Sequence, residues 1–413
     1  MAMTSRERLI TVIEGRLPDH VPVAPDTSNM IPARLTGKPF WDLYLYQDPP
    51  IWKAYLDCVK YFGFDSLMDG YVSIDFDDLP LEDDGYTYEE VIVYRSPDRI
   101  VTQKYREERG KKIWADTVDV YYIADPPTMG LDPHSISLPS IPDHYEPIGE
   151  IRQWPKGEEL LKYVKEEMGD HGLVGVRCGV TKLIESEWEI YDYFDNPDKY
   201  FEKRDRYLEH YVKKFHRLME LECKPDFICT GNSGTLIHQT PQMFRDLALP
   251  IVKEITALCK EYGIPSHVHS CGPQKELVKI MAEETDLTII DPLEIPPMGD
   301  CDLGEIKRLY GDRLVLKGNI HTTEVMLRGT TADVAEAAKR CIDQAAEGGR
   351  FILSTGDQCG RDTPDENIFT MIEVAKTYGR DTDKGTFRLM TRGRFVCHIS
   401  MVTRGRFACH ILN

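Results

Sequence analysis

Short apolar runs and longer amphipathic segments alternate along most of the chain. The amphipathic segments place apolar residues three and four positions apart, as Phe244, Leu247 and Ile251 do, which is the period of a helix with one buried face. The short runs are bounded by Gly, Pro or Asp and fit strands. The predicted strands are residues 18–23, 64–68, 173–176, 226–229, 265–269, 287–290, 314–316 and 351–353.

The order of these elements predicts the fold class. Strands that alternate with helices pair in parallel, because each helix returns the chain to the starting edge of the sheet. About eight such strands in 413 residues favour a closed barrel over an open sheet. No Gly-x-Gly-x-x-Gly motif follows the early strands, which argues against a dinucleotide-binding sheet. We therefore predict an α/β fold, a (β/α)8 TIM barrel with N-terminal helices.

Residues 71–150 interrupt the alternation of strands and helices. Short β-prone runs separated by turns predict an antiparallel meander, and residues 126–147 read as a proline-rich loop. We interpret this stretch as an antiparallel β insertion within a single TIM-barrel domain that covers residues 1–385. Such an insertion either helps to cover a site or is a plain surface elaboration.

The C-terminal tail, residues 386–413, contains an internal repeat. Residues 391–399 recur as 403–411 with one change, from Val396 to Ala408. The repeated Cys-His pair suggests a metal site, but the repeat is too short and too basic to add a core. We expect a disordered or non-native extension.

Composition restricts the range of partners and compartments. A formal net charge of −19 argues against nucleic acid and against an anionic membrane surface. No apolar run approaches the ~18 residues that a membrane span needs, so a cytoplasmic protein is expected. The eleven cysteines are scattered and odd in number, which favours reduced thiols over a disulfide framework.

Candidate chemistry is concentrated after two of the predicted strands. His269 and Cys271 lie on the same side of an extended segment, because side chains alternate along a strand. Cys359 follows the last strand, and a barrel brings the ends of distant strands together. One imidazole and two thiolates suit zinc and leave a fourth position open. The alternative is that both cysteines are buried thiols and His269 is hydrogen-bonded at a strand end.

Three further polar residues follow predicted strands. Glu294 is either a fourth ligand or a proton donor to a leaving oxygen, and otherwise a loop carboxylate. Asn232 is a candidate for orienting the substrate, with a turn role as the alternative. Asp357 is a candidate partner for a ligand or substrate, unless it only caps a loop. Structural roles are expected for His238, His267 and His321, and we expect His267 to point away from the side that His269 occupies.

Several motifs resemble one known family, the uroporphyrinogen decarboxylase superfamily. They occur in the family's order at residues 269–272, 291–294, 316–320, 329–330, 348–353 and 363–367, with a weaker likeness at residues 18–22. The likeness is dense over residues 225–380 and does not cover the insertion or the tail. The family resemblance implies a barrel.

Within that superfamily, a His-x-Cys motif with a distant Cys resembles the zinc methyltransferases that work with corrinoid proteins. The resemblance implies that His269, Cys271 and Cys359 hold zinc and that a methyl group moves between a small molecule and a corrinoid. The chain shows no cobalamin-binding Asp-x-His-x-x-Gly, which implies that the corrinoid arrives on a partner protein. An O-methylated aromatic compound is the preferred donor, because the insertion contains Tyr and Trp residues.

Two alternatives come from other functional classes. A metal-free decarboxylase of a tetrapyrrole-like acid would need a basic pocket, yet residues 22–26, Pro-Val-Ala-Pro-Asp, stand where the arginine-rich substrate motif of those enzymes is expected. A non-catalytic binding module would keep the barrel, and even zinc, without methyl transfer.

Overall fold

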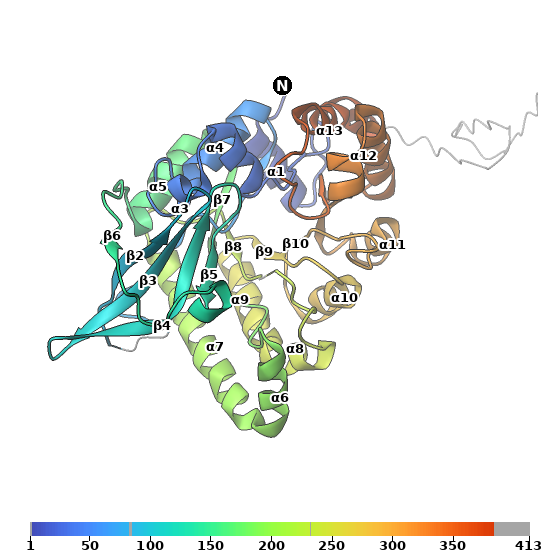
Figure 1. Cartoon of the computed structure of the whole chain (residues 1–413). Coiled ribbons are helices and arrows are strands. Elements are labelled where there is room, and N and C mark those ends of the chain that lie inside the picture. The colour runs from blue at the N-terminus through green and yellow to red at the C-terminus, as the bar shows by residue number, and fades with distance from the viewer. Residues whose placement is uncertain (1, 82–84, 232, 384–413) are drawn as a thin grey trace, which may run out of the picture.

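The computed structural model describes residues 2–81, 85–231 and 233–383, and parallel strands occupy its centre with helices outside them (Figure 1). Seven strands form one parallel sheet in which neighbours in space are also successive strands of the barrel. They are β1 (Ser66–Met68), β7 (Gly172–Arg177), β8 (Phe227–Cys229), β9 (Ser266–His269), β10 (Ile289–Asp291), β11 (Val315–Ile320) and β12 (Phe351–Thr355).

An extended segment around Val23 closes the barrel between the first and the last of these strands. The Ala24 amide donates to the Leu353 carbonyl at 2.9 Å, and the Leu353 amide donates to the Pro22 carbonyl at 2.8 Å. On the other side the Asp65 amide donates to the Val23 carbonyl at 2.8 Å. The segment therefore takes the eighth strand position, and the predicted TIM barrel is confirmed.

Helices precede and follow the strands as the periodicity predicts. The N-terminal helices are α1 (Ser5–Ile13), α2 (Met30–Thr36), α3 (Phe40–Tyr44) and α4 (Ile51–Phe62). The later ones are α5 (Gly157–Met168), α6 (Glu187–Asp195), α7 (Pro197–Glu220), α8 (Pro241–Leu247), α9 (Leu249–Tyr262), α10 (Lys275–Glu284), α11 (Leu303–Tyr310), α12 (Thr331–Ala345) and α13 (Asp365–Thr377). Short helical turns are η1 (Pro133–Ile136), η2 (Gly169–His171), η3 (Thr322–Leu327) and η4 (Tyr378–Asp383).

One predicted helix is divided in the structure. The segment that begins after Thr240 forms α8 and then, after Ala248, a separate α9. Pro250 lies in the first turn of α9, where its missing N–H costs nothing, whereas inside a continuous helix it would remove a hydrogen bond and clash with the preceding turn.

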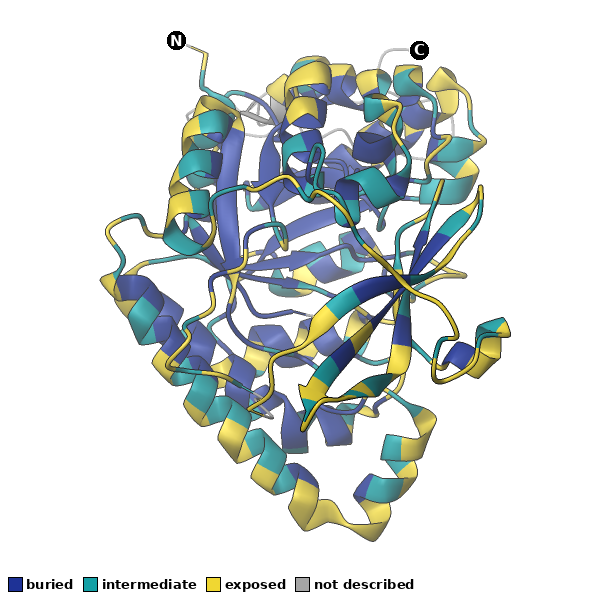
Figure 2. Ribbon diagram, turned by 60° about the vertical axis from the view of Figure 1, so that its left-hand side comes forward, coloured by how far each residue is buried: buried dark blue, intermediate teal, exposed yellow. Residues whose placement is uncertain are grey.

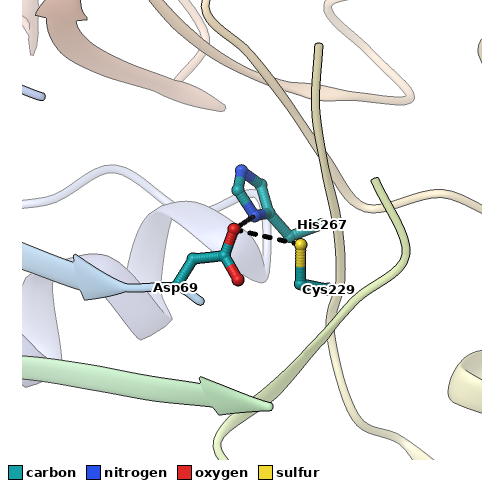
Figure 3. Close-up of side chains that lie close together, drawn as sticks. All are labelled: Asp69, Cys229 and His267. Carbon is teal, nitrogen blue, oxygen red and sulfur yellow. Dashed lines mark hydrogen bonds and ion pairs between the residues drawn. The ribbon is translucent and has the colours of Figure 1, made fainter. Parts of the chain in front are cut away.

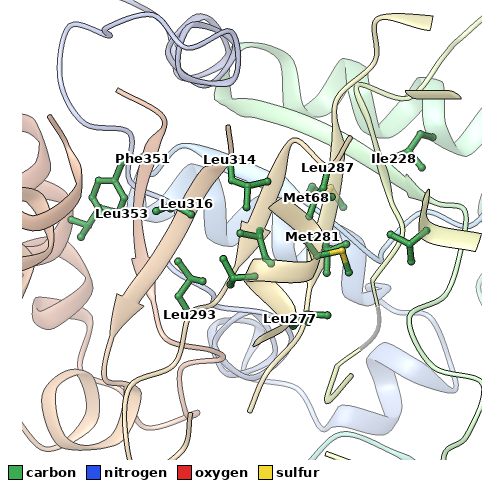
Figure 4. Packing of buried hydrophobic residues seen from close by; sticks show 14 of the residues in the cluster. Met68, Ile228, Leu277, Met281, Leu287, Leu293, Leu314, Leu316, Phe351 and Leu353 are labelled. Atoms are coloured by element: carbon green, nitrogen blue, oxygen red, sulfur yellow. The ribbon is translucent and has the colours of Figure 1, made fainter. Parts of the chain in front are cut away.

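Strand residues face two different apolar regions, because side chains alternate along each strand. Residues on one face, including Ile228, Leu316 and Leu353, pack outward against the helices (Figure 4). Residues on the other face fill the barrel together with Leu9 and Val12 of α1, which closes the end where the strands begin. The inward set is Leu67, Leu173, Phe227, Ile289, Val315 and Ile352. Figure 2 shows the strands buried and the exposed residues on the outer helices and the insertion.

The predicted insertion is an antiparallel sheet of five strands in the order β5-β4-β3-β2-β6. The strands are β2 (Glu89–Arg95), β3 (Arg99–Glu108), β4 (Lys111–Tyr122), β5 (Thr128–Leu131) and β6 (Glu146–Pro147), so the stretch expected to be loop contributes β5 and β6. Leu45 packs with Ile92, Ile100 and Tyr121, which joins the sheet to the segment after α3. The insertion leaves the barrel directly after β1, at the edge where active sites of such barrels form.

The sequence also led to expectations for the C-terminal tail and for membrane-spanning segments. The repeated tail, residues 386–413, lies outside the described residues. Among the residues that the structure describes, no helix combines the length and the apolar composition that crossing a membrane requires.

We expect Asp226→Asn to destabilise the barrel by about 2–3 kcal/mol at pH 7. The Asp226 carboxylate binds Arg6 at 2.6 Å and Lys165 at 2.9 Å and accepts from the Val174 amide at 2.9 Å, which ties α1 and α5 to β7. Urea unfolding monitored by circular dichroism would measure the loss.

The pH dependence of that loss has a defined sign. Burial raises the pKa of Asp226, but hydrogen bonds from Arg6 and Lys165 lower it below its ordinary value of 3.8 overall. A carboxyl with a depressed pKa stabilises the fold above its unfolded pKa, and this contribution disappears as pH falls through the folded value. The difference between the two proteins should therefore shrink below about pH 4. Glu209→Gln, in an exposed pair with Lys213, is the matched control and should leave the midpoint unchanged.

Candidate metal site at the carboxyl ends of the strands

A layer of polar side chains lies inside the barrel, directly above the apolar layer. Four of its members come two positions after an inward apolar residue, so the strand period turns them to the same face, and the other two lie two positions apart on β9. The polar layer consists of Asp69, Cys229, His267, His269, Asp291 and Lys317. It lies where the strands end, which is the catalytic edge of a TIM barrel.

Asp291 is the centre of this polar layer. Its carboxylate is 1% exposed and forms an ion pair with the Lys317 ammonium. Its Oδ1 atom lies 3.2 Å from Nε2 of His267 and 3.0 Å from Nδ1 of His269. Both imidazoles therefore donate to one carboxylate oxygen.

The Asp291–Lys317 pair is ionised inside the barrel. Burial alone would raise the pKa of Asp291, but attraction to Lys317 and the two histidines lowers it well below its usual range. Burial lowers the pKa of Lys317, and attraction to Asp291 raises it above its ordinary value overall. Each group thus stabilises the charged form of the other, because a charge buried in a low-dielectric interior needs a partner of opposite charge.

His269, Cys271 and Asp357 converge beyond this pair. One nitrogen, sulfur or oxygen atom of each lies within 4.8 Å of the others. Nε2 of His269 is 3.6 Å from Oδ1 of Asp357, on the ring side opposite Asp291. Burial raises the pKa of Asp357 to about 6, although His269 opposes the shift.

The chemistry of this group fits a divalent metal such as zinc. Zinc bonds of about 2.0–2.3 Å in a tetrahedron place donor atoms about 3.3–3.7 Å apart, close to the observed His269–Asp357 distance. A histidine ligand usually donates its second N–H to a carboxylate, as His269 does to Asp291. Burial lowers the pKa of His269, but Asp291 and Cys271 raise it well above its ordinary value, so Nε2 attracts a positive charge, either a proton or a metal ion.

Cys359 has different surroundings from those of the other two predicted ligands. Its side chain is fully buried, and its amide donates to the Asp26 carbonyl at 2.8 Å. Burial, with a smaller effect of Asp26, raises the pKa of the thiol to about 12. Among the described residues, Cys359 belongs to no group of three donors within 4.8 Å. Its role as a ligand remains a prediction, and Asp357, two residues earlier, takes the third place in the geometry.

The loop after β12 holds Asp357 in an unusual backbone conformation. Its φ of 101° lies in a region that side chains other than hydrogen rarely adopt. The hydroxyl of Thr355 donates to the Asp357 carbonyl at 2.8 Å and fixes this turn. Such strain persists where surrounding contacts enforce it, and it turns the Asp357 carboxylate toward His269.

The remaining predicted residues have different outcomes. Glu294 is 5% exposed, and its carboxylate accepts a hydrogen bond from the amide of Gly272, next to Cys271. Its roles as ligand or proton donor remain predictions. Asn232 lies outside the described residues. His321 is structural, since its Nδ1 accepts from the Thr323 and Glu324 amides at 3.1 and 3.2 Å.

The expected orientation of His267 was wrong. His267 and His269 bind the same oxygen of Asp291, because residues two apart on a strand face the same side. The same reasoning would have found Asp291 and Lys317, which sequence analysis did not propose as site residues. Each lies two positions after an inward apolar residue, Ile289 or Val315.

Comparisons with known proteins give a family and several relatives. Residues 196–378 match the family described as uroporphyrinogen decarboxylase (URO-D). Two curated relatives, each named methylcobamide:CoM methyltransferase MtbA, come from Methanosarcina acetivorans and Methanosarcina mazei. They are 28% and 29% identical over 137 and 139 residues, which is 33% of this chain and 37% of each relative. The matched segment thus spans just over a third of those relatives.

A solved structure extends the likeness in fold. It is a methyltransferase from Methanosarcina mazei with a TM-score of 0.60 and 16% identity, covering 91% of this chain and 99% of that one. The predicted resemblance to the uroporphyrinogen decarboxylase superfamily, and to its methyltransferase branch, is confirmed by these matches. Residues 196–378 contain β8 to β12 and therefore all three predicted zinc ligands.

We expect Asp291→Asn to destabilise the protein by about 3 kcal/mol, because it leaves the buried Lys317 ammonium without a counter-charge. Urea unfolding at pH 7 measures the effect. In the double variant with Lys317→Met, the buried charge is gone and the combined loss should fall below the sum of the single losses by at least about 1 kcal/mol. Additive losses would contradict an interacting pair.

Proposed function

We propose that this protein is a zinc-dependent methyltransferase that moves a methyl group between a small methylated substrate and a corrinoid protein. The observation that carries the proposal is the arrangement of His269, with Nδ1 held by the buried Asp291 and Nε2 facing Cys271 and a carboxylate. This arrangement lies at the catalytic edge of the barrel. The likeness of this chain to methylcobamide:CoM methyltransferases over 137 and 139 residues supports a methyltransferase, and the match of residues 196–378 to the uroporphyrinogen decarboxylase family supports the superfamily.

His269 and Cys271 would hold the metal, with Cys359 as the predicted third ligand and Asp357 as the carboxylate that the geometry places beside them. Zinc at such a site acts as a Lewis acid that stabilises a departing oxygen anion or keeps a bound thiol deprotonated. Asp291 fixes the tautomer of His269, and Lys317 keeps Asp291 ionised. Glu294 holds the Gly272 amide and so restrains the turn that carries Cys271.

Aromatic side chains near this edge support an aromatic substrate. Tyr55 and Tyr71 stack with ring centroids 4.5 Å apart, and the Tyr71 hydroxyl donates to the Ser28 carbonyl at 2.6 Å. Asp26 joins these residues to the loop after β12, since its amide donates to the Thr355 hydroxyl at 3.0 Å. The stacked pair, with Tyr55 on α4 and Tyr71 at the start of the insertion, would wall a pocket for an O-methyl aromatic ether.

Exposed aromatic residues support a protein partner. Helix α6 lies in the connection that leaves β7 at the carboxyl end of the barrel, and its Trp188 and Phe194 are 80% and 69% exposed. Large aromatic side chains are enriched at protein interfaces, and exposed apolar groups of this size mark contact surfaces. A corrinoid protein that docks over the barrel mouth would cover them.

Elemental analysis of the purified protein tests the metal ligands. His269→Ala and Cys271→Ser should each release the zinc held at this site, because the two ligands that remain in each variant are too few to bind the ion tightly. Cys359→Ser and Asp357→Asn identify the third ligand, since the true ligand should be the one whose substitution releases zinc. Cys259→Ala, which removes another buried thiol on α9, is the matched control and should keep full zinc content. Zinc retention by Cys271→Ser at wild-type level would exclude the site.

The methyl donor is tested by the absorbance change that accompanies methylcobalamin formation from cob(I)alamin. Methoxylated aromatics should support transfer at least about tenfold faster than methylamines or methyl thioethers, a difference of about 1.4 kcal/mol in barrier height. Faster transfer from an amine or thioether would contradict the aromatic substrate but would still support a methyltransferase. Bound zinc without any transfer would indicate a binding module, and a protein without zinc would favour the decarboxylase alternative.

A further inference from the structure

A second group of potential metal donors lies deeper in the barrel, below the His269 site. Asp69 follows β1, Cys229 ends β8 and His267 lies in β9, and their side chains converge (Figure 3). One nitrogen, sulfur or oxygen atom of each lies within 4.8 Å of the others. Oδ2 of Asp69 is 3.0 Å from Sγ of Cys229 and 3.7 Å from Nδ1 of His267. The 3.7 Å separation lies at the upper end of the about 3.3–3.7 Å between donors around one tetrahedral zinc ion, and the 3.0 Å separation is the shorter hydrogen-bond distance of a protonated thiol.

Two atoms of this group are buried without a hydrogen-bond partner among the described residues. They are Nδ1 of His267 and Oδ1 of Asp69. His267 is 3% exposed, and its distance of 3.7 Å from Asp69 is too long for a hydrogen bond. A buried polar atom that lacks a partner has lost its hydrogen bonds to water without replacing them, so each such atom calls for a binding partner.

The hydrogen bond made by Nε2 of His267 determines whether Nδ1 carries a proton or a lone pair. Nε2 donates its proton to Asp291, so in a neutral ring Nδ1 carries a lone pair that faces the carboxylate of Asp69. Two electron-rich atoms that face each other inside a barrel are unfavourable unless a cation lies between them. A hydrogen bond from the Cys229 thiol satisfies one oxygen of Asp69 but leaves Nδ1 unpaired.

We propose that Asp69, Cys229 and His267 form a second divalent-metal site, for zinc or a cation of similar softness. One nitrogen, one sulfur and one oxygen donor suit such an ion and leave a fourth position open. Binding displaces the proton of the Cys229 thiol to solvent, so the thiolate, the imidazole and the carboxylate are the ligands. Asp69 has a side-chain exposure of 16%, and the ion enters from its side.

The two sites share one carboxylate. Asp291 accepts from His267 on one side and from His269 on the other, which directs the free nitrogen of each ring to a separate donor group. The inference therefore builds on the proposed zinc site, but its ligands are different residues. An ion at the second site also ties β1 to β8 and β9 at the point where the insertion begins.

Metal content of the full chain, measured after exchange into metal-free buffer, tests the inference. The wild-type protein should retain about two equivalents of zinc, and Cys229→Ala and Asp69→Asn should each retain about one. Cys271→Ser should also retain about one, and the double variant Cys229→Ala/Cys271→Ser none. Cys178→Ala, another fully buried cysteine, is the matched control and should retain both.

Cobalt substitution supplies a second readout that does not depend on activity. Absorbance from thiolate-to-cobalt charge transfer should fall in Cys229→Ala and, separately, in Cys271→Ser. A wild-type chain with one ion that Cys271→Ser removes would overturn the second site and leave the proposed function intact. A single ion that Cys229→Ala removes and Cys271→Ser keeps would support the second site and contradict the first. Two ions retained by Cys229→Ala would also overturn the inference.

Discussion

The ion pair between Asp291 and Lys317 is the interaction on which the polar interior of this barrel depends. A buried carboxylate costs several kcal/mol of desolvation, and here an ammonium and two imidazole N–H groups offset that cost. Because one oxygen accepts from both His267 and His269, a single residue sets the tautomer and the orientation of both rings. The carboxylate of Asp291 thereby links the two groups of donor atoms that contain these histidines.

The barrel supports this pair by separating apolar and polar residues into layers. Leu67, Phe227 and Ile289 fill the lower part, where α1 excludes water from the strand starts. The next inward positions are polar and lie toward the open end. Phe227 also contacts His267 edge-on at 5.8 Å, so the apolar layer directly supports the ring that faces Asp69 and Cys229. A rigid apolar base thus limits how far the polar side chains can relax.

The uroporphyrinogen decarboxylase family model matches only part of the barrel. Residues 196–378 carry β8 to β12 and the candidate ligands, whereas the insertion and Asp69 lie outside that match. The candidate ligands and the insertion therefore belong to separate segments, which meet because the Val23 segment closes the barrel between β12 and β1. Loops that follow barrel strands vary independently of the strands themselves, so such a division is expected of this fold.

By itself the sequence determined the barrel, the insertion and the region of the candidate site. Strand and helix periods are local, and the place of His269 and Cys271 after a strand follows from them. Only the tertiary structure decided which donors meet. The backbone turn after β12 brings Asp357 toward His269 and leaves Cys359 beside Asp26, because loop conformation depends on contacts with distant strands. The partnership of Asp291 with Lys317, and the meeting of Asp69 with Cys229, likewise join strands that are distant in sequence, and no local pattern specifies such contacts.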